Sequence, residues 1–369
     1  MCGISAIIGK TKQNKKDIEA MLLPIINRGE KKYFNENTDL TTCVLGMNRL
    51  AIVDREKAKQ PIKSSDGRYY IIFNGEIYNY KNLQKELIKK GYKFSTDSDT
   101  EVLVNGYAEW GEKLLDKISG IFAFFIFDKK ENSFFVARDP LGIKPLYWAT
   151  DKNNTYYFAS EIKSLAQNKK IATINLFPPA HFMKEGKLKK YWSFPTKVNH
   201  KITEKEAVVK IRELFDNAIK KRVQTDLPVA VYLSGGIDST AVLATAIKYH
   251  QNVTAIIVGN KNSNDKKIAI RYCKENNIKY IIGIPPTEID LSKNISNIVK
   301  ITESFEPNMI RQSAISYYIA KTAAEGDFKV ILCGDGADEL FAGYPEFTQL
   351  KTNQEIEKKV FSFLSDLHR

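Results

Sequence analysis

Two kinds of hydrophobic spacing alternate along the second half of the chain. Short apolar and β-branched runs, typical of buried strands, are each followed by a longer stretch with the spacing of an amphipathic helix. The expected strands cover 229–233, 254–258, 279–284 and 328–333, and the expected helices cover 239–249, 265–276, 290–302 and 313–325. This alternation predicts a parallel sheet with helices on both faces. A helix over 204–222, with one apolar face that should be buried, precedes the first strand.

The first half has a different pattern, in which strand-like runs outnumber helical ones. The expected strands cover 3–8, 43–48, 69–73, 146–149 and 155–159, and 121–127 and 133–137 form a hairpin. Helices are expected over 17–26, 80–90 and 100–110, and Asp99 is placed to cap the last of them. Strands with helices on separate segments predict a layered α+β sandwich, not a doubly wound sheet.

The change of pattern indicates two domains, which a chain of 369 residues is long enough to form. Extended segments that carry Pro178, Pro179 and Pro195 separate the two patterns. We therefore expect a first domain over 2–190, a linker over 191–204 and a second domain over 205–369.

Composition indicates a soluble globular protein, because 43% of the residues are hydrophobic and charges of both signs are mixed throughout. The longest apolar stretches are far shorter than a bilayer-spanning helix, and the N-terminus lacks the features of a signal peptide. A cytoplasmic location without a membrane partner is therefore expected. The net charge of +13 comes from scattered lysines without interleaved aromatic residues, which argues against a nucleic-acid partner.

Four cysteines occur, and no two have the spacing of a metal or redox pair. Cys43, Cys273 and Cys333 are expected to be small buried hydrophobic residues. Cys2 differs, because removal of Met1 would leave a thiol and a free α-amine on the same carbon. Such an amine has a reference pKa of about 7.7–8.0 and can act as the base for the thiol. The sequence therefore offers a nucleophile that needs no histidine.

The first strand of the second half runs into the loop Ser234-Gly235-Gly236-Ile237-Asp238-Ser239-Thr240. Its glycines permit a tight turn and close approach to a ligand, and the first amides of the following helix form an anion site. The loop lacks the lysine of the phosphate loop in kinases and carries Asp238, which could hold Mg²⁺ beside a pyrophosphate. It is therefore expected to bind the pyrophosphate part of ATP in a reaction that releases AMP.

A second polar loop, Cys333-Gly334-Asp335-Gly336-Ala337-Asp338-Glu339, follows the strand at 328–333. Three carboxylates so close together are costly unless cations are near. Parallel sheets bind ligands at the carboxyl ends of their strands, so both loops are expected at one edge of the sheet. Taken alone, the second loop could also be a solvated acidic turn at the start of a helix.

Several motifs of the first half resemble, in order, the N-terminal-nucleophile (Ntn) glutaminase domain of class II glutamine amidotransferases. They are Met1-Cys2-Gly3, 49–54, 74–79, Ser98-Asp99, 138–147 and 160–163. The resemblance implies a four-layer sandwich with Cys2 as nucleophile and with Asn74 and Gly75 as the oxyanion hole. It also implies that Arg49 pairs with the glutamine α-carboxylate in forked geometry, and that Glu76 and Asp99 receive the α-ammonium group. The implied glutamine-binding residues are Arg49, Leu50, Ala51, Ile52, Val53, Asn74, Gly75, Glu76 and Asp99.

The two loops of the second half together resemble the ATP-pyrophosphatase domain, of the adenine nucleotide hydrolase type, of asparagine synthetases that use glutamine. The implied ATP-binding residues are Leu233, Ser234, Gly235, Gly236, Asp238, Ser239, Val258, Cys333 and Gly334. The resemblance implies that Asp238 and Asp338 bind Mg²⁺ and that Asp335 helps to form an acyl-adenylate. The implied reaction makes asparagine from aspartate, glutamine and ATP through β-aspartyl-AMP, and releases glutamate, AMP and diphosphate.

The chain departs from these families in three places. Residues 27–31 read Asn-Arg-Gly-Glu-Lys where relatives have His-Arg-Gly-Pro-Asp, and Cys333 replaces a usual serine. Relatives also continue beyond the region equivalent to 367–369, with an Arg-x-Pro-Phe-Leu-Asp segment and a lysine near the phosphates. The chain is therefore expected to be either a fragment or a natural short form.

Two alternatives stay open. One is a related ATP-dependent amidotransferase that acts on another carboxylate or closes a lactam. The other is a non-catalytic protein that binds only glutamine and nucleotide, against which the retained Cys2, Asn74 and Asp238 argue. A homodimer is also left open.

Overall fold

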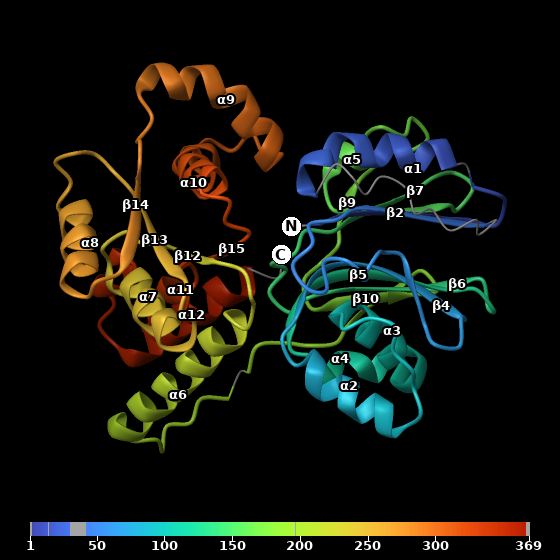
Figure 1. Cartoon of the computed structure of the whole chain (residues 1–369), viewed down its shortest axis with the longest axis horizontal. Helices are drawn as coiled ribbons and strands as arrows, with labels where there is room; N and C mark the ends of the chain where they lie inside the picture. The colour runs from blue at the N-terminus through green and yellow to red at the C-terminus, as the bar shows by residue number, and fades with distance from the viewer. Residues whose placement is uncertain (1, 14, 30–41, 196, 367–369) are drawn as a thin grey trace. The chain divides into compact units, whose positions relative to one another are not determined.

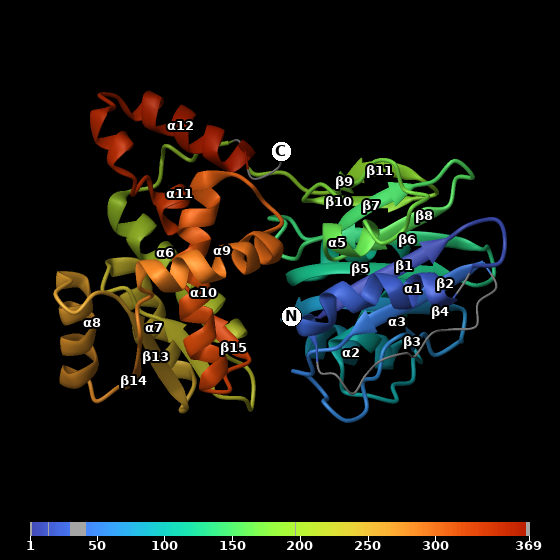
Figure 2. The ribbon, with the colours of Figure 1, turned by 90° about the horizontal axis from the view of Figure 1, so that it is seen from above.

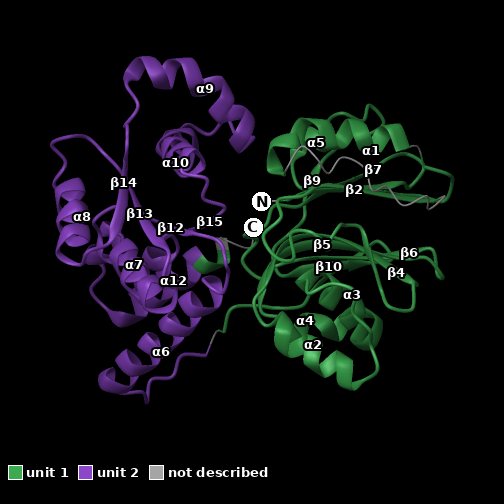
Figure 3. Cartoon of the chain, in the orientation of Figure 1, with its two compact units in different colours: residues 1–196, 364–369 green, residues 197–363 purple. Residues whose placement is uncertain are grey.

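The computed structural model describes residues 2–13, 15–29, 42–195 and 197–366. The chain divides into two compact units, which we call unit 1 (residues 1–196 and 364–369) and unit 2 (residues 197–363) (Figure 3). Glu30 and Lys31, two of the five positions of the divergent 27–31 segment, lie outside the described residues.

Unit 1 contains two antiparallel sheets, as the alternation of strand-like runs predicts. The strands of the first sheet lie in the order β2 (Cys43–Asn48), β1 (Gly3–Ile8), β8 (Tyr156–Ala159), β7 (Tyr147–Thr150) and β9 (Asn175–Leu176). Those of the second lie in the order β11 (Lys187–Lys190), β10 (His181–Lys184), β6 (Ser133–Arg138), β5 (Gly120–Asp128), β4 (Tyr69–Ile77) and β3 (Ile62–Lys63). The expected hairpin is confirmed, with Phe127 opposite Phe134.

Helices cover the outer faces of both sheets (Figure 1). Buried apolar side chains from both sheets pack together between them. One layer holds α1 (Lys15–Leu22), η1 (Leu23–Arg28) and α5 (Ile162–Leu165), and α1 runs along β1 and β2 in both views (Figures 1 and 2). The other layer holds α2 (Tyr80–Lys89), α3 (Asp99–Trp110), η2 (Gly111–Lys113) and α4 (Leu114–Lys117). The predicted four-layer sandwich is therefore confirmed.

Two local predictions in unit 1 are wrong. The helix expected over 17–26 changes at Leu22 into a 3-10 helix, because Pro24 cannot donate the next α-helical hydrogen bond. The cap of α3 is Ser98, whose Oγ accepts the Thr100 N–H at 3.1 Å, and not Asp99. Asp99 belongs to the first helical turn and is buried.

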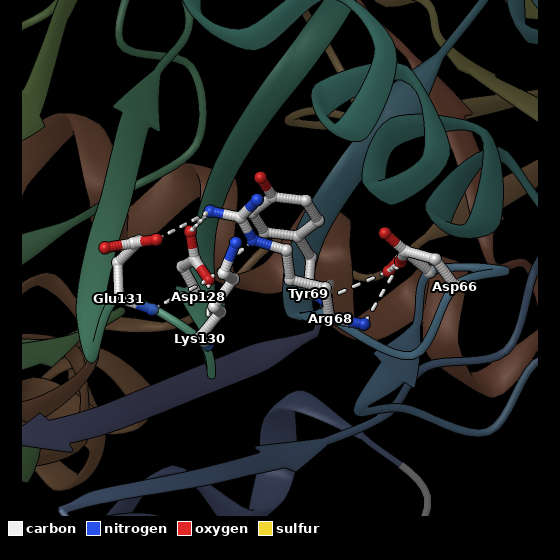
Figure 4. A network of polar contacts seen from close by, with 7 residues as sticks. Asp66, Arg68, Tyr69, Asp128, Lys130 and Glu131 are labelled. Atoms are coloured by element: carbon white, nitrogen blue, oxygen red, sulfur yellow. Dashed lines mark hydrogen bonds and ion pairs between the residues drawn. The ribbon is translucent and has the colours of Figure 1, made fainter.

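A network of polar contacts lies at the turn between β5 and β6 in unit 1 (Figure 4). Arg68 donates to both carboxylate oxygens of Asp128, from Nε at 2.9 Å and from Nη2 at 2.6 Å. Its guanidinium also lies over the ring of Tyr69, with Cζ 4.9 Å from the ring centroid. A bidentate pair at a mostly buried carboxylate ties the loop before β4 to the end of β5.

Unit 2 is built on a four-stranded parallel sheet in the order β14 (Lys279–Gly283), β13 (Val253–Val258), β12 (Val229–Tyr232) and β15 (Val330–Leu332). One face packs against α6 (Glu204–Arg222), α7 (Ile237–Tyr249) and α8 (Asn264–Glu275). The other packs against α10 (Pro307–Glu325), which in turn contacts α9 (Glu288–Thr302). The chain ends with α11 (Ala337–Phe341), η3 (Pro345–Gln349) and α12 (Asn353–Asp366). The predicted parallel sheet with helices on both faces is confirmed.

The apolar face of α6 is only partly buried, which corrects the sequence prediction. Ile219 near its end is buried in the core of unit 2, whereas Val208, Ile211 and Leu214 are 54%, 45% and 71% exposed. The helix extends beyond the sheet that it covers, so its first half has no core in unit 2 to pack against.

The described helices show no candidate membrane span. Each is either shorter or more polar than a bilayer crossing requires.

Candidate functional site

Cys2 lies directly before β1 and is held on two sides. The Leu50 N–H donates to its Sγ at 3.3 Å, and Arg28 Nε donates to its carbonyl at 3.0 Å. Arg28 in turn pairs with Glu161, so a partly buried charge pair supports the backbone of the nucleophile. Neither Arg28 nor Glu161 was identified from the sequence. Glu161 lies in the 160–163 run that carried the resemblance, and Arg28 lies in the divergent 27–31 segment.

The thiol of Cys2 is half-buried, and its surroundings act on its ionisation in opposite directions. Burial raises the pKa of the thiol, while the Leu50 amide and Arg49 lower it. The net result is a raised pKa, so the thiol is protonated at neutral pH and a base must accept its proton during attack.

Asn74 presents an unused hydrogen-bond donor inside unit 1. It lies on β4, is 1% exposed, and its Nδ2 has no partner among the described residues. An unsatisfied buried donor costs about 1–3 kcal/mol, so the site is arranged for an oxygen that the protein does not itself supply. The next residue, Gly75, admits no side chain, because a Cβ would lie 2.1 Å from the carbonyl oxygen of Ile121 on β5.

Arg49 is buried, and part of its guanidinium group is hydrogen-bonded to the backbone of the loop that follows it. Nη1 donates to the Arg55 carbonyl at 2.9 Å, and Nη2 donates to the carbonyls of Val53 and Asp54 at 3.0 and 2.9 Å. These bonds use three of the five N–H groups and leave two for a carboxylate. Ala51, in the same loop, is buried, and Leu50, Ile52 and Val53 are partly exposed.

Two carboxylates, Glu76 on β4 and Asp99 on α3, lie close enough to titrate as a pair. Burial and the charge of Asp99 raise the pKa of Glu76 to about 8. Burial raises the pKa of Asp99 to about 6, although its carboxylate accepts the Ile77 N–H at 3.0 Å. Like charges in a poorly solvated site favour retention of one proton, and a bound cation would favour its release.

Lys144 is a charged residue of this site that the sequence reasoning missed. It is 8% exposed, and the groups whose charges act on it include Glu76, Arg28 and Cys2. The available signal was its place in the 138–147 run, which carried the resemblance without a role for any single residue.

In unit 2, the Ser234 loop forms the turn between β12 and the N-terminus of α7. The two serine hydroxyls, Ser234 Oγ and Ser239 Oγ, lie 2.9 Å apart, and the Gly236 N–H donates to Ser234 Oγ at 3.2 Å. Gly235 has φ of +96°, and a Cβ there would lie 2.3 Å from the Asp265 carbonyl oxygen, so only glycine fits. The sequence predicted this strand, turn and helix N-terminus correctly.

The Cys333 loop lies beside it, because β15 is the neighbour of β12 in the sheet. A Cβ on Gly334 would lie 3.0 Å from both Asp238 Cβ and the Ser239 nitrogen, so the two loops touch. The strand order changes direction between β12 and β15, which is where open parallel sheets bind ligands. Leu233 is buried and Val258 half-buried at the same carboxyl edge of the sheet.

Cys333 is exposed, which corrects the expectation that it would be buried. It follows β15 at the carboxyl edge of the sheet, where the chain leaves the core. Its thiol donates to Asp335 at 3.1 Å, so this pair lies on the loop surface.

The expected magnesium ligands, Asp238 and Asp338, have carboxylates without a hydrogen bond or ion pair to any described residue. No group of three or more His, Cys, Asp or Glu side chains that could hold a metal occurs within the described ranges. Mg²⁺ prefers oxygen ligands and is commonly bound by one or two carboxylates together with substrate phosphates. The two aspartates therefore fit a metal that arrives with a nucleotide better than a permanent metal site.

Comparisons with known proteins match both units. Residues 1–204 match the glutamine amidotransferase domain family, and residues 210–367 match the asparagine synthase family. The chain is 33% identical to glutamine-hydrolysing asparagine synthetase 1 of Bacillus subtilis (strain 168), over 93% of this chain and 59% of that protein. It is 30% identical to the glutamine-hydrolysing asparagine synthetase of Sandersonia aurantiaca, over 100% of this chain and 72% of that protein.

The matched relatives are longer than the chain. A third relative, glutamine-hydrolysing asparagine synthetase 3 of Arabidopsis thaliana, is 29% identical over 100% of this chain and 65% of its own. The chain therefore spans about three-fifths of the length of several curated relatives. Among solved structures, glutamine phosphoribosylpyrophosphate amidotransferase of B. subtilis matches 90% of each chain with 16% identity and a TM-score of 0.42.

Proposed function

The chain belongs to the glutamine-hydrolysing asparagine synthetase family, and from this premise we propose that it catalyses, with ATP, the transfer of the amide nitrogen of glutamine to aspartate. The products are asparagine, glutamate, AMP and diphosphate. The observation that carries the proposal is that one chain holds both an unused oxyanion donor, Asn74, in unit 1 and two touching ligand loops at the sheet edge of unit 2. A glutaminase alone has no need for the second feature.

In the proposed glutaminase step, removal of Met1 frees the α-amine of Cys2, and this amine accepts the proton of the thiol. The thiolate then attacks the side-chain carbonyl carbon of glutamine. The charge that develops on the carbonyl oxygen is stabilised by Asn74 Nδ2 and the Gly75 amide. The intermediate collapses to a glutamyl thioester as the protonated nitrogen leaves as ammonia, and water then hydrolyses the thioester to glutamate.

Recognition of glutamine falls to charged groups of opposite sign. The remaining N–H groups of Arg49 donate to the α-carboxylate, and Glu76 and Asp99 receive the α-ammonium group. The loop Leu50-Ala51-Ile52-Val53 lines the pocket. The raised pKa values of the two carboxylates support this role, since a substrate cation would relieve the repulsion between them.

In the proposed synthetase step, the loop from Ser234 to Ser239 holds the phosphates of ATP with its amides and hydroxyls. Leu233, Val258, Cys333 and Gly334 contact the nucleoside, and Asp335 assists formation of β-aspartyl-AMP. Asp238 and Asp338 would hold Mg²⁺, which when bound neutralises phosphate charge. Ammonia then displaces AMP from the acyl-adenylate.

The remaining parts of the proposal concern location and partners. We place the protein in the cytoplasm, with glutamine, aspartate and ATP as its small-molecule partners. The lack of a candidate membrane span among the described residues and the four unpaired cysteines support this placement.

A single substitution tests whether glutamine hydrolysis and the ATP-dependent formation of asparagine are carried out by separate sites. Cys2→Ala is expected to abolish release of glutamate from glutamine, and to leave asparagine formation from ammonium, aspartate and ATP unchanged. Amino-acid analysis of both reactions measures this. A variant that still hydrolyses glutamine would contradict the role of Cys2, and a parent protein that neither hydrolyses glutamine nor cleaves ATP would contradict the enzyme.

A further inference from the structure

Lys144 is a buried lysine whose ammonium group has no bonded partner among the described residues. Its residue is 8% exposed, and its Nζ makes no hydrogen bond or ion pair with any described residue. Lysine is almost never buried unless it is paired, and burial lowers the pKa of this ammonium. A charge kept in this position at such a cost indicates a function for the charge itself.

The backbone around Lys144 is fixed on both sides. The Lys144 N–H donates to the Asp139 carboxylate at 2.9 Å, and its carbonyl accepts from Arg138 Nε at 2.8 Å. The same Asp139 carboxylate accepts three further amides, from Phe122, Leu141 and Ile143. A turn that is fixed by these hydrogen bonds therefore holds the backbone of Lys144 in place.

The groups that face this ammonium come from several elements of unit 1. Glu76 on β4 acts on it most strongly, followed by Arg28 on η1, Cys2 before β1 and Asp139 in its own turn. Glu76 itself is faced by Asp99 on α3 and by Lys144. Lys144 is thus the side-chain cation that most directly offsets the repulsion between the two carboxylates.

We propose that Lys144 is a positioning residue of the glutamine pocket that acts through Glu76, favouring the ionised form of this carboxylate so that less free energy is needed to ionise it when the α-ammonium group of glutamine binds. This inference rests on the proposed glutaminase function. It adds a role for a residue that neither the motifs nor the comparisons assign.

The proposal has a consequence that a purely structural role would not have. Lys144 attracts Glu76 and repels the substrate ammonium, so its benefit is confined to pH values at which Glu76 would otherwise be protonated. Without Lys144, the pKa of Glu76 rises further. The affinity for glutamine then falls near neutral pH and recovers as the pH approaches the new pKa.

The test is the KM for glutamine of Lys144→Met, measured as glutamate release across the pH range. If the pKa of Glu76 rises by about one unit, KM rises about tenfold near pH 7 and less than about twofold near pH 9, with kcat nearly unchanged. Titration of glutamine itself cancels in the ratio to the parent. Lys144→Arg keeps the charge and is expected to keep the parent profile, and Lys152→Met, at an exposed lysine of the same unit, is the matched control.

A second experiment asks whether the effect passes through Glu76. In the Glu76→Gln background, Lys144→Met is expected to produce no further rise in KM, because the carboxylate on which Lys144 is proposed to act has been removed. A rise that is equal at all pH values, a loss in kcat alone, or a full effect in the Glu76→Gln background would overturn the proposal.

The proposal and the proposed function can fail separately. If the parent hydrolyses no glutamine, the proposed function fails, and calorimetry of glutamine binding to the Cys2→Ala protein still measures affinity against pH with and without Lys144→Met. An affinity that is independent of Lys144 at every pH, or no glutamine binding at all, overturns the positioning role. Circular dichroism of each variant confirms that it is folded.

Discussion

Glutamine binding is predicted to release a proton near neutral pH, because Glu76 holds one in the empty pocket. With a pKa of about 8, Glu76 is about nine-tenths protonated at pH 7. The α-ammonium group of glutamine favours the ionised carboxylate and expels this proton. Close to one proton is therefore released per glutamine at pH 7, falling to about one-tenth at pH 9.

The sign of the resulting pH dependence follows from the direction of the shift. Because the free pocket binds a proton that the complex does not, glutamine affinity rises with pH up to about 8, by up to about tenfold per unit, and then levels off. An acid with a lowered pKa in the free pocket would show no such rise near neutrality.

Calorimetry on the Cys2→Ala protein, in buffers of different ionisation enthalpy, measures the released protons directly, since this variant binds glutamine without consuming it. Glu76→Gln is expected to remove the release, whereas Glu131→Gln, at an exposed carboxylate of the β5–β6 turn, leaves it unchanged. Binding without proton release at pH 7 would refute this assignment of Glu76.

Two further substitutions test the geometry of each unit. Gly235→Ala is expected to abolish the rise in melting temperature that ATP produces, because its Cβ would lie 2.3 Å from the Asp265 carbonyl oxygen at a φ of +96°; an unchanged ATP-induced shift would contradict the loop's role. Asp128→Asn is expected to lower the melting temperature of unit 1 by breaking the bidentate pair with Arg68, whereas Glu131→Gln, 3.6 Å from the same guanidinium and exposed, is expected to have little effect. Equal melting temperatures for the two variants would contradict this difference.

Most of the fold could be predicted from spacing, and the errors share a cause. Strand and helix types follow from hydrophobic periods that the core enforces, as the β5–β6 hairpin and the four parallel strands illustrate. Two of the wrong predictions concern helix ends, where a single residue determines how the helix begins or stops. Pro24 interrupts a helical pattern, and Ser98 takes the cap beside an equally suitable Asp99. The exposed first half of α6 shows that an apolar stripe predicts a helix but does not reveal what covers it.

Only those residues of the candidate site to which a family motif assigns a role could be predicted from the sequence. The sequence singled out Cys2 and Asn74 as candidates. It did not reveal that three N–H groups of Arg49 donate to carbonyl oxygens of the loop that follows it. Arg28 and Lys144 are distant in sequence from the residues they support, and only the packing of separate elements brings their charges to Cys2 and Glu76. Contacts of this kind depend on tertiary structure, which periodicity and spacing do not encode.

The central claim is that one chain couples glutamine hydrolysis to adenylation of aspartate. The most direct measurement follows diphosphate release and asparagine formation from ATP and glutamine, with aspartate present or absent. The account predicts that both products require aspartate, in equal amounts, and that Cys2→Ala forms asparagine only when ammonium replaces glutamine. Diphosphate release that ignores aspartate, or that responds only to another carboxylic acid, would contradict it.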